Sequence, residues 1–419
     1  MRFMHIADIH LGNLQYGLKD RYNDFTRAFR YLIDVALEEP VEGLLLAGDL
    51  FDKQSVDPLA MRVAVQEFAR LRDAGIPVLA VEGNHVRAAY RHQDSWIDFL
   101  NAFGYLRLLS YDPRKGLRPH GEEGGAYVDL PGGVRVYGMG YYGAATGRVL
   151  GQFAAALDDH DKGDVRYTIF LAHTGLEGQL AHLRGSTYEE FAPLREHIDY
   201  IALGHFHKPF EVDDWIYNPG SPETCSMDEV AWPQRGYYLV EVLPDTGTRH
   251  RAELRAVPRR PFHRFTLPVD GYTDPASVYD GVRDLIARKD SEVAPASRPI
   301  IQLSLTGVLP FSRYDLDLVY IQDLLEAAWS PLGRPQVVNR STPAEFEMAL
   351  DLEIGRAELE YQVVRQLLER DSRFRADAAE WTGGVLELKR LALGGGPPEA
   401  VVEHLRRLRD TLQTPAEED

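Results

Sequence analysis

Five apolar segments of this chain each run directly into side chains that can bind a metal ion. Short apolar runs that stop at a glycine or a polar residue are typical of buried strands in an α/β sheet. The carboxyl ends of such strands lie along one edge of the sheet, where ligands bind. We therefore expect these side chains to converge on one site, although they are far apart in the chain. In chain order they are Asp8, His10, Asp49, Asn84, His85, His173, His205 and His207.

The second of these segments shows the pattern most clearly. Residues 44–47 are all aliphatic or small, which predicts a strand that is buried on both faces. Gly48 then allows a sharp turn, and Asp49 follows it at the end of the strand. A buried carboxylate there is costly unless a cation faces it, so the sequence predicts a cationic partner for Asp49.

Apolar spacing predicts alternating strands and helices through the first part of the chain. Strands are expected at 1–7, 44–47 and 76–81, with helices over 24–39 and 58–74 between them. This alternation indicates right-handed crossovers that build a largely parallel sheet. Later strands have shorter connections, which favour antiparallel additions and a core of two sheets. We place these strands at 134–139, 167–172, 199–203, 215–217 and 236–242.

The sequence predicts three domains, of which residues 1–261 form the first. Residues 262–342 alternate predicted helices and strands, as in a small α/β domain. Residues 343–419 are mostly helical, with apolar residues at three- and four-residue or near-heptad spacing. Such helical faces either pack on their own protein or dock a partner, and the sequence leaves both interpretations open.

Composition limits the kind of protein that this chain can be. Its 419 residues carry a formal net charge of -18, which argues against a generic basic DNA-binding protein. A nucleic-acid enzyme whose positive charge comes from bound metal stays possible. The single cysteine, Cys225, suits a reducing compartment, and no apolar run has the length of a membrane span or the form of a signal peptide. We therefore expect a cytoplasmic protein with no membrane association.

One stretch of the chain is densely basic. Six arginines and a single glutamate lie between positions 249 and 264. The stretch is interpreted either as an edge strand guarded by charge or as a surface that follows phosphates beside the active site.

The ligand types favour a pair of transition-metal ions. Asp, Asn and His offer oxygen and nitrogen donors, which suit manganese, iron or zinc better than calcium. Seven ligands are too many for one ion with an open position, whereas two ions about 3.5 to 4 Å apart use them with Asp49 as the bridge. Such a pair keeps a net charge of about +1 once two carboxylates and a hydroxide are bound, which favours a phosphodiester substrate. His85 is left to donate to a substrate oxygen, and Asp52 is expected to orient and charge it.

These motifs resemble the calcineurin-like metallophosphoesterase superfamily, and nearly the whole chain is similar to its DNA double-strand-break repair nucleases of the SbcD and Mre-eleven type. The likeness extends to Leu11-Gly12, residues 21–29 and residues 218–222. It implies an α/β fold, a two-sheet sandwich flanked by helices, followed by a small α/β capping domain and a helical carboxyl-terminal tail. It also implies two divalent ions, preferably manganese. One ion is expected on Asp8, His10, Asp49 and His207, and the other on Asp49, Asn84, His173 and His205.

The resemblance implies a manganese-dependent DNA exonuclease, with endonuclease activity left open, that acts in double-strand-break repair. The capping domain would shape access of DNA, the helical tail would bind an SbcC-type coiled-coil ATPase, and the chain would form a homodimer. Two positions depart from the family pattern: Val86 stands where an acidic residue is usual, and Asp52 stands where some archaeal relatives carry histidine. Two alternatives are a di-metal phosphodiesterase or phosphatase for small substrates, and a metal-stabilised scaffold without activity.

Overall fold

The computed structural model describes residues 1–85, 94–122, 124–181, 183–244, 249–343, 355–370, 374–394 and 398–413. Val86 therefore lies outside the described residues. Contacts divide the chain into two units, Met1–Phe262 and His263–Asp419. The three domains expected from the sequence, 1–261, 262–342 and 343–419, stay a prediction.

The first unit contains two sheets of six strands. The first sheet has the order β12-β11-β1-β2-β3-β4, in which β1 to β4 are parallel and β11 and β12 are added antiparallel at one side. Its central strand β2 (Leu44–Leu46) is fully buried, as its aliphatic sequence predicts. The other strands are β1 (Arg2–Ile6), β3 (Val78–Ala80), β4 (Arg107–Leu108), β11 (Gly236–Val242) and β12 (His250–Ala256).

The second sheet has the order β5-β6-β7-β8-β10-β9. Strands β6, β7, β8 and β10 are parallel, and the two edge strands β5 and β9 pair antiparallel with their neighbours. The antiparallel additions and the two-sheet core expected from the short connections are both present. The strands are β5 (Tyr127–Leu130), β6 (Val134–Met139), β7 (Tyr167–His173), β8 (Tyr200–Gly204), β9 (Phe210–Val212) and β10 (Ile216–Asn218).

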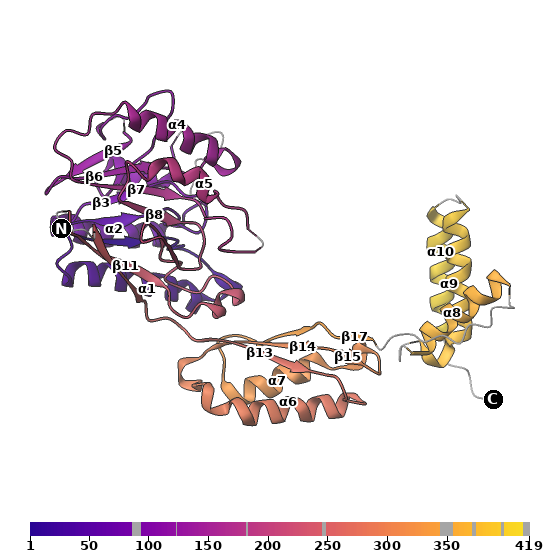
Figure 1. The fold of residues 1–419 in the computed structure, drawn as a ribbon. Helices are drawn as coiled ribbons and strands as arrows, with labels where there is room; N and C mark the ends of the chain where they lie inside the picture. Colours follow the sequence, from indigo (N-terminus) through magenta and orange to yellow (C-terminus); the bar gives the residue numbers. More distant parts are fainter. Residues whose placement is uncertain are drawn as a thin grey trace, which may run out of the picture. The chain divides into compact units, whose positions relative to one another are not determined.

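Three apolar clusters stack the first unit into four layers. One cluster joins the first sheet to its helices, one joins the second sheet to its helices, and the third lies between the sheets. Figure 1 shows α1 on one side of the sheets and α4 and α5 on the other. The fold is thus a two-sheet sandwich flanked by helices, as expected. The helices are α1 (Lys19–Glu38), α2 (Pro58–Asp73), α3 (Trp96–Ala102), α4 (Thr146–Asp158) and α5 (Tyr188–Phe191).

Helix boundaries show where local sequence signals succeed and fail. Helix α2 begins at Pro58 as predicted, because Asp57 caps it by accepting from the amides of Leu59 and Ala60. Helix α1 begins at Lys19, five residues before the predicted start, and no side chain caps it. Helix α4 begins at Thr146, just after the glycine at 143, and no side chain caps it either.

The second unit contains a small α/β sheet with two helices, and then further helices. The sheet has the order β13-β14-β16, and a separate pair joins β15 to β17. Helix α6 starts after Asp274, which caps it in a reciprocal contact with Ser277. The strands are β13 (Phe262–Pro268), β14 (Ile300–Thr306), β15 (Val308–Leu309), β16 (Gln336–Asn339) and β17 (Thr342–Pro343). The helices are α6 (Pro275–Lys289), α7 (Leu318–Trp329), α8 (Arg356–Arg370), α9 (Ala378–Leu393) and α10 (Pro398–Gln413).

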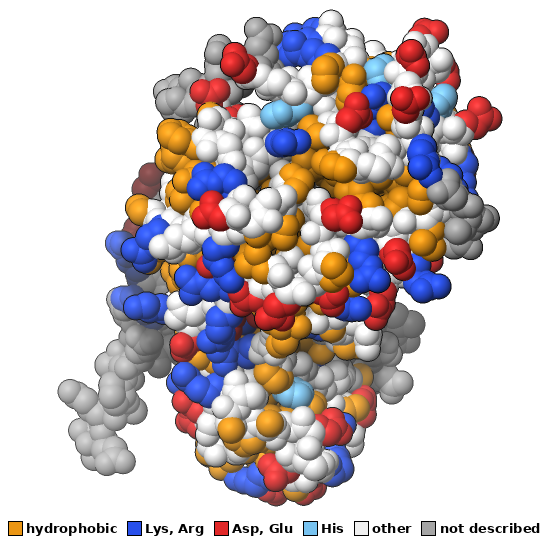
Figure 2. Space-filling view, turned by 90° about the vertical axis from the view of Figure 1, so that its left-hand side faces the viewer, with side chains coloured by type: hydrophobic (Ala, Val, Ile, Leu, Met, Phe, Trp, Pro, Cys, Tyr) orange, Lys and Arg blue, Asp and Glu red, His pale blue; other side chains and the backbone are white. Residues whose placement is uncertain are grey.

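The surface carries both signs of charge. Lys and Arg side chains are interspersed with Asp and Glu over the face drawn in Figure 2. Within the described ranges, no helix combines the length and the apolar character that a membrane span requires.

A buried histidine joins the two sheets of the first unit. His5 on β1 donates from Nε2 to the main-chain oxygen of Leu203 and accepts from the hydroxyl of Tyr200, both at 3.0 Å and both on β8. Burial lowers the pKa of His5 to about 3, against the effect of the Leu203 carbonyl. The imidazole therefore stays neutral in the native state at pH values where the unfolded chain binds a proton.

We expect His5 to contribute to acid sensitivity of the fold. Below its ordinary pKa of 6.5 and down to about 3, the unfolded state binds one more proton at this residue, so stability falls as the pH falls. In His5→Gln the slope of unfolding free energy against pH should be smaller by up to about 1.4 kcal/mol per pH unit. Urea denaturation at a series of pH values measures this slope. Equal slopes in both proteins would contradict the assignment.

Candidate metal centre

The seven predicted ligands lie together at the carboxyl ends of strands from both sheets. The first sheet supplies those that follow β1, β2 and β3, and the second sheet supplies those at β7 and β8. Four of the seven are buried, namely Asp8, His10, Asp49 and His173. The other three are half-buried, namely Asn84, His205 and His207.

One part of the cluster is formed by two facing histidines and two carboxylates. The Nε2 atoms of His10 and His207 lie 3.1 Å apart. Donor atoms of Asp8, His10 and Asp49 all lie within 4.8 Å of one another. Asp8 also accepts hydrogen bonds from the main-chain nitrogen of His205, at 3.0 and 3.1 Å, and so joins the two sheets at this point. These groups match the set that was expected for the first ion.

The other part of the cluster is centred on Asn84. Its Oδ1 lies 3.0 Å from Nε2 of His173 and 2.9 Å from Nδ1 of His205. The same Nε2 of His173 lies 3.1 Å from Oδ2 of Asp49. Asp49 therefore touches both parts of the cluster, which is the position that a bridging ligand requires.

The hydrogen bonds of the histidines leave lone pairs that face one another. His173 donates from Nδ1 to the main-chain oxygen of Ala47 at 2.7 Å, so its neutral Nε2 carries a lone pair toward the Asp49 carboxylate. His207 donates from Nδ1 to Glu229 at 2.7 Å, so its Nε2 likewise presents a lone pair to His10. Acceptors that face acceptors are stabilised by a cation between them. The donor set fits divalent metal ions.

An unpaired nitrogen of His10 is a second observation that favours a cation at this site. Its Nδ1 is buried and has no hydrogen-bond partner among the described residues. A neutral His10 that donates from Nε2 to His207 leaves this Nδ1 bare. If His10 held a cation through Nε2, its proton would stand on Nδ1, which lies 3.7 Å from the carboxylate of Asp52.

Protons occupy the site when no metal does. Burial alone would lower the pKa of His173, but the carboxylates of Asp49 and Asp8 raise it to about 9. Burial would raise the pKa of Asp49, but His173, His10 and His85 together bring it below its ordinary value. A divalent ion held by His173 would therefore take the place of this proton.

The backbone at the site is tightly constrained. Asp8, His10, Asp49 and His205 all have positive φ, between 48° and 83°, in the left-handed region that few side chains adopt. Gly83 allows the close approach of the next strand end, because a Cβ there would lie 2.1 Å from Oδ1 of Asp49. Strand ends packed this closely hold the ligands in fixed positions.

His85 lies at the exposed edge of the cluster. Its main-chain nitrogen donates to Oδ1 of Asp49 at 2.9 Å, and its ring Nδ1 donates to the main-chain oxygen of Asp52 at 2.7 Å. The hydrogen bond that orients His85 therefore comes from the backbone of Asp52, where the sequence analysis had expected the carboxylate. Nε2 of His85 is left for a substrate.

Two further groups contact the candidate ligands and were not predicted from the sequence. Glu229, which is buried, binds His207 and is itself held by Arg235 and by the main-chain nitrogen of Cys225. The ring of Tyr141 lies 5.5 Å from that of His205. No spacing or composition in the sequence marks either residue, because both approach the ligands only through the fold.

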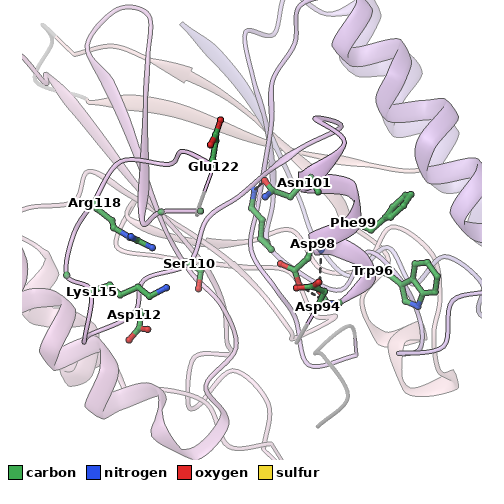
Figure 3. Close-up of a pocket in the computed structure, with 16 residues that line it drawn as sticks. Asp94, Trp96, Asp98, Phe99, Asn101, Ser110, Asp112, Lys115, Arg118 and Glu122 are labelled. Atoms are coloured by element: carbon green, nitrogen blue, oxygen red, sulfur yellow. Dashed lines mark hydrogen bonds between the residues drawn. The ribbon is translucent and has the colours of Figure 1, made fainter. Parts of the chain in front are cut away.

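A separate cavity of about 740 Å³ lies beside α3. Figure 3 shows Asp112, Lys115 and Arg118 on one side of it and Asp94 and Asp98 on the other. None of its lining residues is one of the predicted ligands, so the cavity is distinct from the metal centre.

The fold and the cluster define a metallophosphoesterase: residues 1–209 match the family described as calcineurin-like phosphoesterase, and the chain belongs to this family. The chain is 28% identical over 321 residues to the DNA double-strand break repair protein Mre11 of Aeropyrum pernix, a match that covers 74% of this chain and 75% of that protein. It is 26% identical to the Mre11 protein of Saccharolobus solfataricus, over 76% of this chain and 78% of that protein. It is also 29% identical to the uncharacterized metallophosphoesterase YhaO of Bacillus subtilis, over 58% of this chain and 57% of that protein.

We expect Glu229 to set the affinity of the centre for metal. Glu229→Gln removes the charge that fixes the proton on Nδ1 of His207 and keeps Nε2 free. Loss of such a supporting contact weakens metal binding by about 10- to 100-fold. Calorimetric titration with manganese measures the change, and Glu189→Gln, at an exposed position of α5, is the matched control. Equal affinities in Glu229→Gln and the control would contradict this role.

Proposed function

We propose that this protein is a manganese-dependent DNA nuclease that acts on double-strand breaks together with an SbcC-type ATPase. The observation that carries the proposal is the convergence of Asp8, His10, Asp49, Asn84, His173, His205 and His207 in a chain similar, over three quarters of its length, to proteins named for double-strand-break repair. We place the protein in the cytoplasm, as its single cysteine predicted.

The residues of the site divide the work of phosphodiester hydrolysis. Two divalent ions at this site supply positive charge for the phosphate oxygens and a water that ionises near neutral pH. Asp49 holds both halves of the ligand set together and accepts the main-chain nitrogen of His85. The carbonyl of Asp52 keeps a proton on Nδ1 of His85. Nε2 of the protonated ring then donates to the leaving oxygen, which is the role proposed for His85.

Features of the second unit favour the part of the proposal that concerns a macromolecular substrate and a partner. In this proposal residues 262–342 shape access of DNA to the centre, and residues 343–419 bind the ATPase. Apolar side chains of α8, α9 and α10 are exposed, with Leu367 at 54%, Leu393 at 77% and Leu405 at 46%. Exposed apolar residues on one set of helices favour a binding surface for a partner.

We expect His85→Ala to lose DNA cleavage and to keep its metal. Removal of a general acid costs about 100- to 10,000-fold in rate. End-labelled linear duplex DNA with manganese, with and without the ATPase, measures cleavage, and manganese titration measures metal binding. His197→Ala, which removes a histidine that pairs with Asp158 outside the ligand cluster, is the control and should cleave normally.

Several results would overturn the proposal in different ways. Absence of cleavage by the wild-type chain, with or without the ATPase, would exclude the nuclease. Turnover of a small aryl phosphodiester that DNA does not inhibit would favour the small-substrate phosphodiesterase. A normal function of His85→Ala would favour the scaffold.

We further propose that the nuclease is a homodimer that pairs through α3. Trp96, Phe99 and Phe103 form an exposed ridge, with exposed fractions of 44%, 37% and 62%. Their rings contact one another in series, at centroid distances of 6.2 and 4.5 Å. Adjacent exposed aromatic rings are the residues that dominate protein interfaces.

The dimer predicts a change in sedimentation when the ridge is made polar. Phe103→Asp places a charge in the apolar contact, and the dissociation constant should rise by at least about 30-fold, or 2 kcal/mol. Leu183→Asp is a matched control, because Leu183 is 53% exposed and lies outside α3. A wild-type chain that sediments as a monomer at every concentration would contradict the dimer.

A further inference from the structure

A second pocket of the first unit lies next to the support of the metal centre. Its volume is about 350 Å³, and it is lined by twelve residues that fall within 224–235 and 256–262. Three of the lining residues are arginines, Arg235, Arg259 and Arg260, and one is the half-buried Trp232. Glu229 is the one acidic residue among those that line it. This concentration of guanidinium groups contrasts with the mixed charges of the surface in Figure 2.

The guanidinium group of Arg235 does not have a hydrogen-bond partner for every donor. Arg235 donates to Glu229 and to the hydroxyls of Ser221 and Thr224, at 3.2 and 2.7 Å for the two hydroxyls. The carboxylate of Glu229 is shared with His207. Arg235 is 1% exposed, yet its Nε has no hydrogen-bond partner among the described residues. A buried donor without a partner is costly, so an acceptor is expected at this side chain.

Arg259 has no carboxylate partner within the described part of the chain. Its guanidinium donates to main-chain oxygens, at 3.0 Å to Arg235, at 3.4 Å to Val257, and also to Pro233. Burial and then the charge of Arg235 lower the pKa of Arg259 to about 10. The guanidinium of Arg259 thus lies near the like charge of Arg235 with no direct carboxylate partner among the described residues, and the charges of Glu223 and Glu229 offset this repulsion only in part. An anion in the pocket would relieve this repulsion.

Arg260 belongs to an adjoining ionic cluster. It donates to Asp24 at 2.7 and 3.0 Å, and the same carboxylate also pairs with Arg21 and Arg27. Arg21 also pairs with Glu223 at 3.1 Å, so the cluster holds more than one carboxylate. These contacts fix Arg260 in place at the edge of the pocket.

We propose that this pocket binds a phosphate group through Arg235 and Arg259, and that during catalysis the group belongs to a DNA strand held beside the metal centre. Guanidinium groups match the oxygens of phosphate and bind it with paired hydrogen bonds. Glu229 lines the pocket and also binds the ligand His207, so the pocket is one residue away from the centre. The assignment to DNA rests on the proposed nuclease function, whereas phosphate binding by the pocket does not.

The arginines of the basic stretch 249–264 differ in the contacts that they make. Arg249 pairs with Asp199, and Arg255 pairs with Glu39 and Glu253, along the edge strand β12. Those two arginines fit the interpretation of a charged edge strand. Arg259 differs from them, because it lines the pocket and its hydrogen bonds within the described residues are to main-chain oxygens alone.

DNA binding by the full-length chain tests the strand assignment. Fluorescence anisotropy with labelled duplex in EDTA, over a series of salt concentrations, gives the slope of log affinity against log salt. Arg259→Gln should weaken binding and reduce the slope by about 0.9, the value for one phosphate contact. Arg259→Lys keeps the charge and should restore most of the slope. Arg251→Gln, at an exposed position of β12, is the matched control and should bind as the wild type does.

Inorganic phosphate tests the pocket itself. Calorimetry in EDTA, where no metal is available to hold phosphate, should show binding to the wild type that Arg259→Gln loses. Thermal unfolding of both proteins shows whether Arg259→Gln is folded. If this variant does not fold, the wild-type titration and the Arg259→Lys variant decide the matter.

The outcomes separate the two sources of phosphate. A smaller salt slope together with lost phosphate binding supports the strand assignment. Lost phosphate binding with an unchanged slope supports a site for free phosphate and overturns the strand assignment. Absence of phosphate binding by the wild type, with equal slopes in all variants, overturns the proposal even if the enzyme cleaves DNA. Phosphate binding at Arg259 in a chain that does not cleave DNA would instead contradict the nuclease function alone.

Discussion

The structure depends on a set of acceptor groups that require cations. Buried carboxylates from two strands meet imidazole nitrogens whose protons are already committed elsewhere, as at His173 and His207. Four of the candidate ligands are buried, so bound positive charge would offset the cost of bringing their acceptor atoms together. The strained φ angles at the strand ends and the contact between Gly83 and Asp49 belong to the same requirement. Fold and chemistry are therefore linked. The packing that brings the acceptor atoms together also creates the donor set that fits divalent metal ions.

The positions of the candidate ligands follow from local sequence patterns, whereas the groups that contact them do not. The ligands follow apolar strands, and their positions could be predicted because strand ends in an α/β sheet converge. Strands β6 and β11 were predicted with their observed bounds, since apolar residues dominate both strands and glycine or proline residues lie close to their ends. The family and the sandwich architecture were likewise predicted correctly. Apolar periodicity and turn residues are sufficient to predict such strands and their arrangement in sheets.

Other features depend on contacts that no local pattern records. Helix α1 extends to Lys19 without a side-chain cap, because packing of its buried face outweighs the missing signal. Helix α4 starts within a glycine-containing stretch for the same reason. Glu229 reaches His207 from a short 3-10 helix, Met227–Ala231, that follows β10, and Asp52 holds His85 through its backbone. Backbone contacts do not depend on side-chain identity, so the sequence could not distinguish them.

The ligand set is split between two sheets, and this division has a consequence for how the enzyme can vary. Asp8, His10, Asp49 and Asn84 follow strands of one sheet, while the remaining histidines belong to the other. The distance between the two halves is therefore determined by the packing of the sheets, where His5 bonds to Tyr200. Residues at that contact lie outside the set of candidate ligands. Natural variation there can nevertheless adjust ionic radius preference, so homologues with identical ligands need not share the same favoured metal.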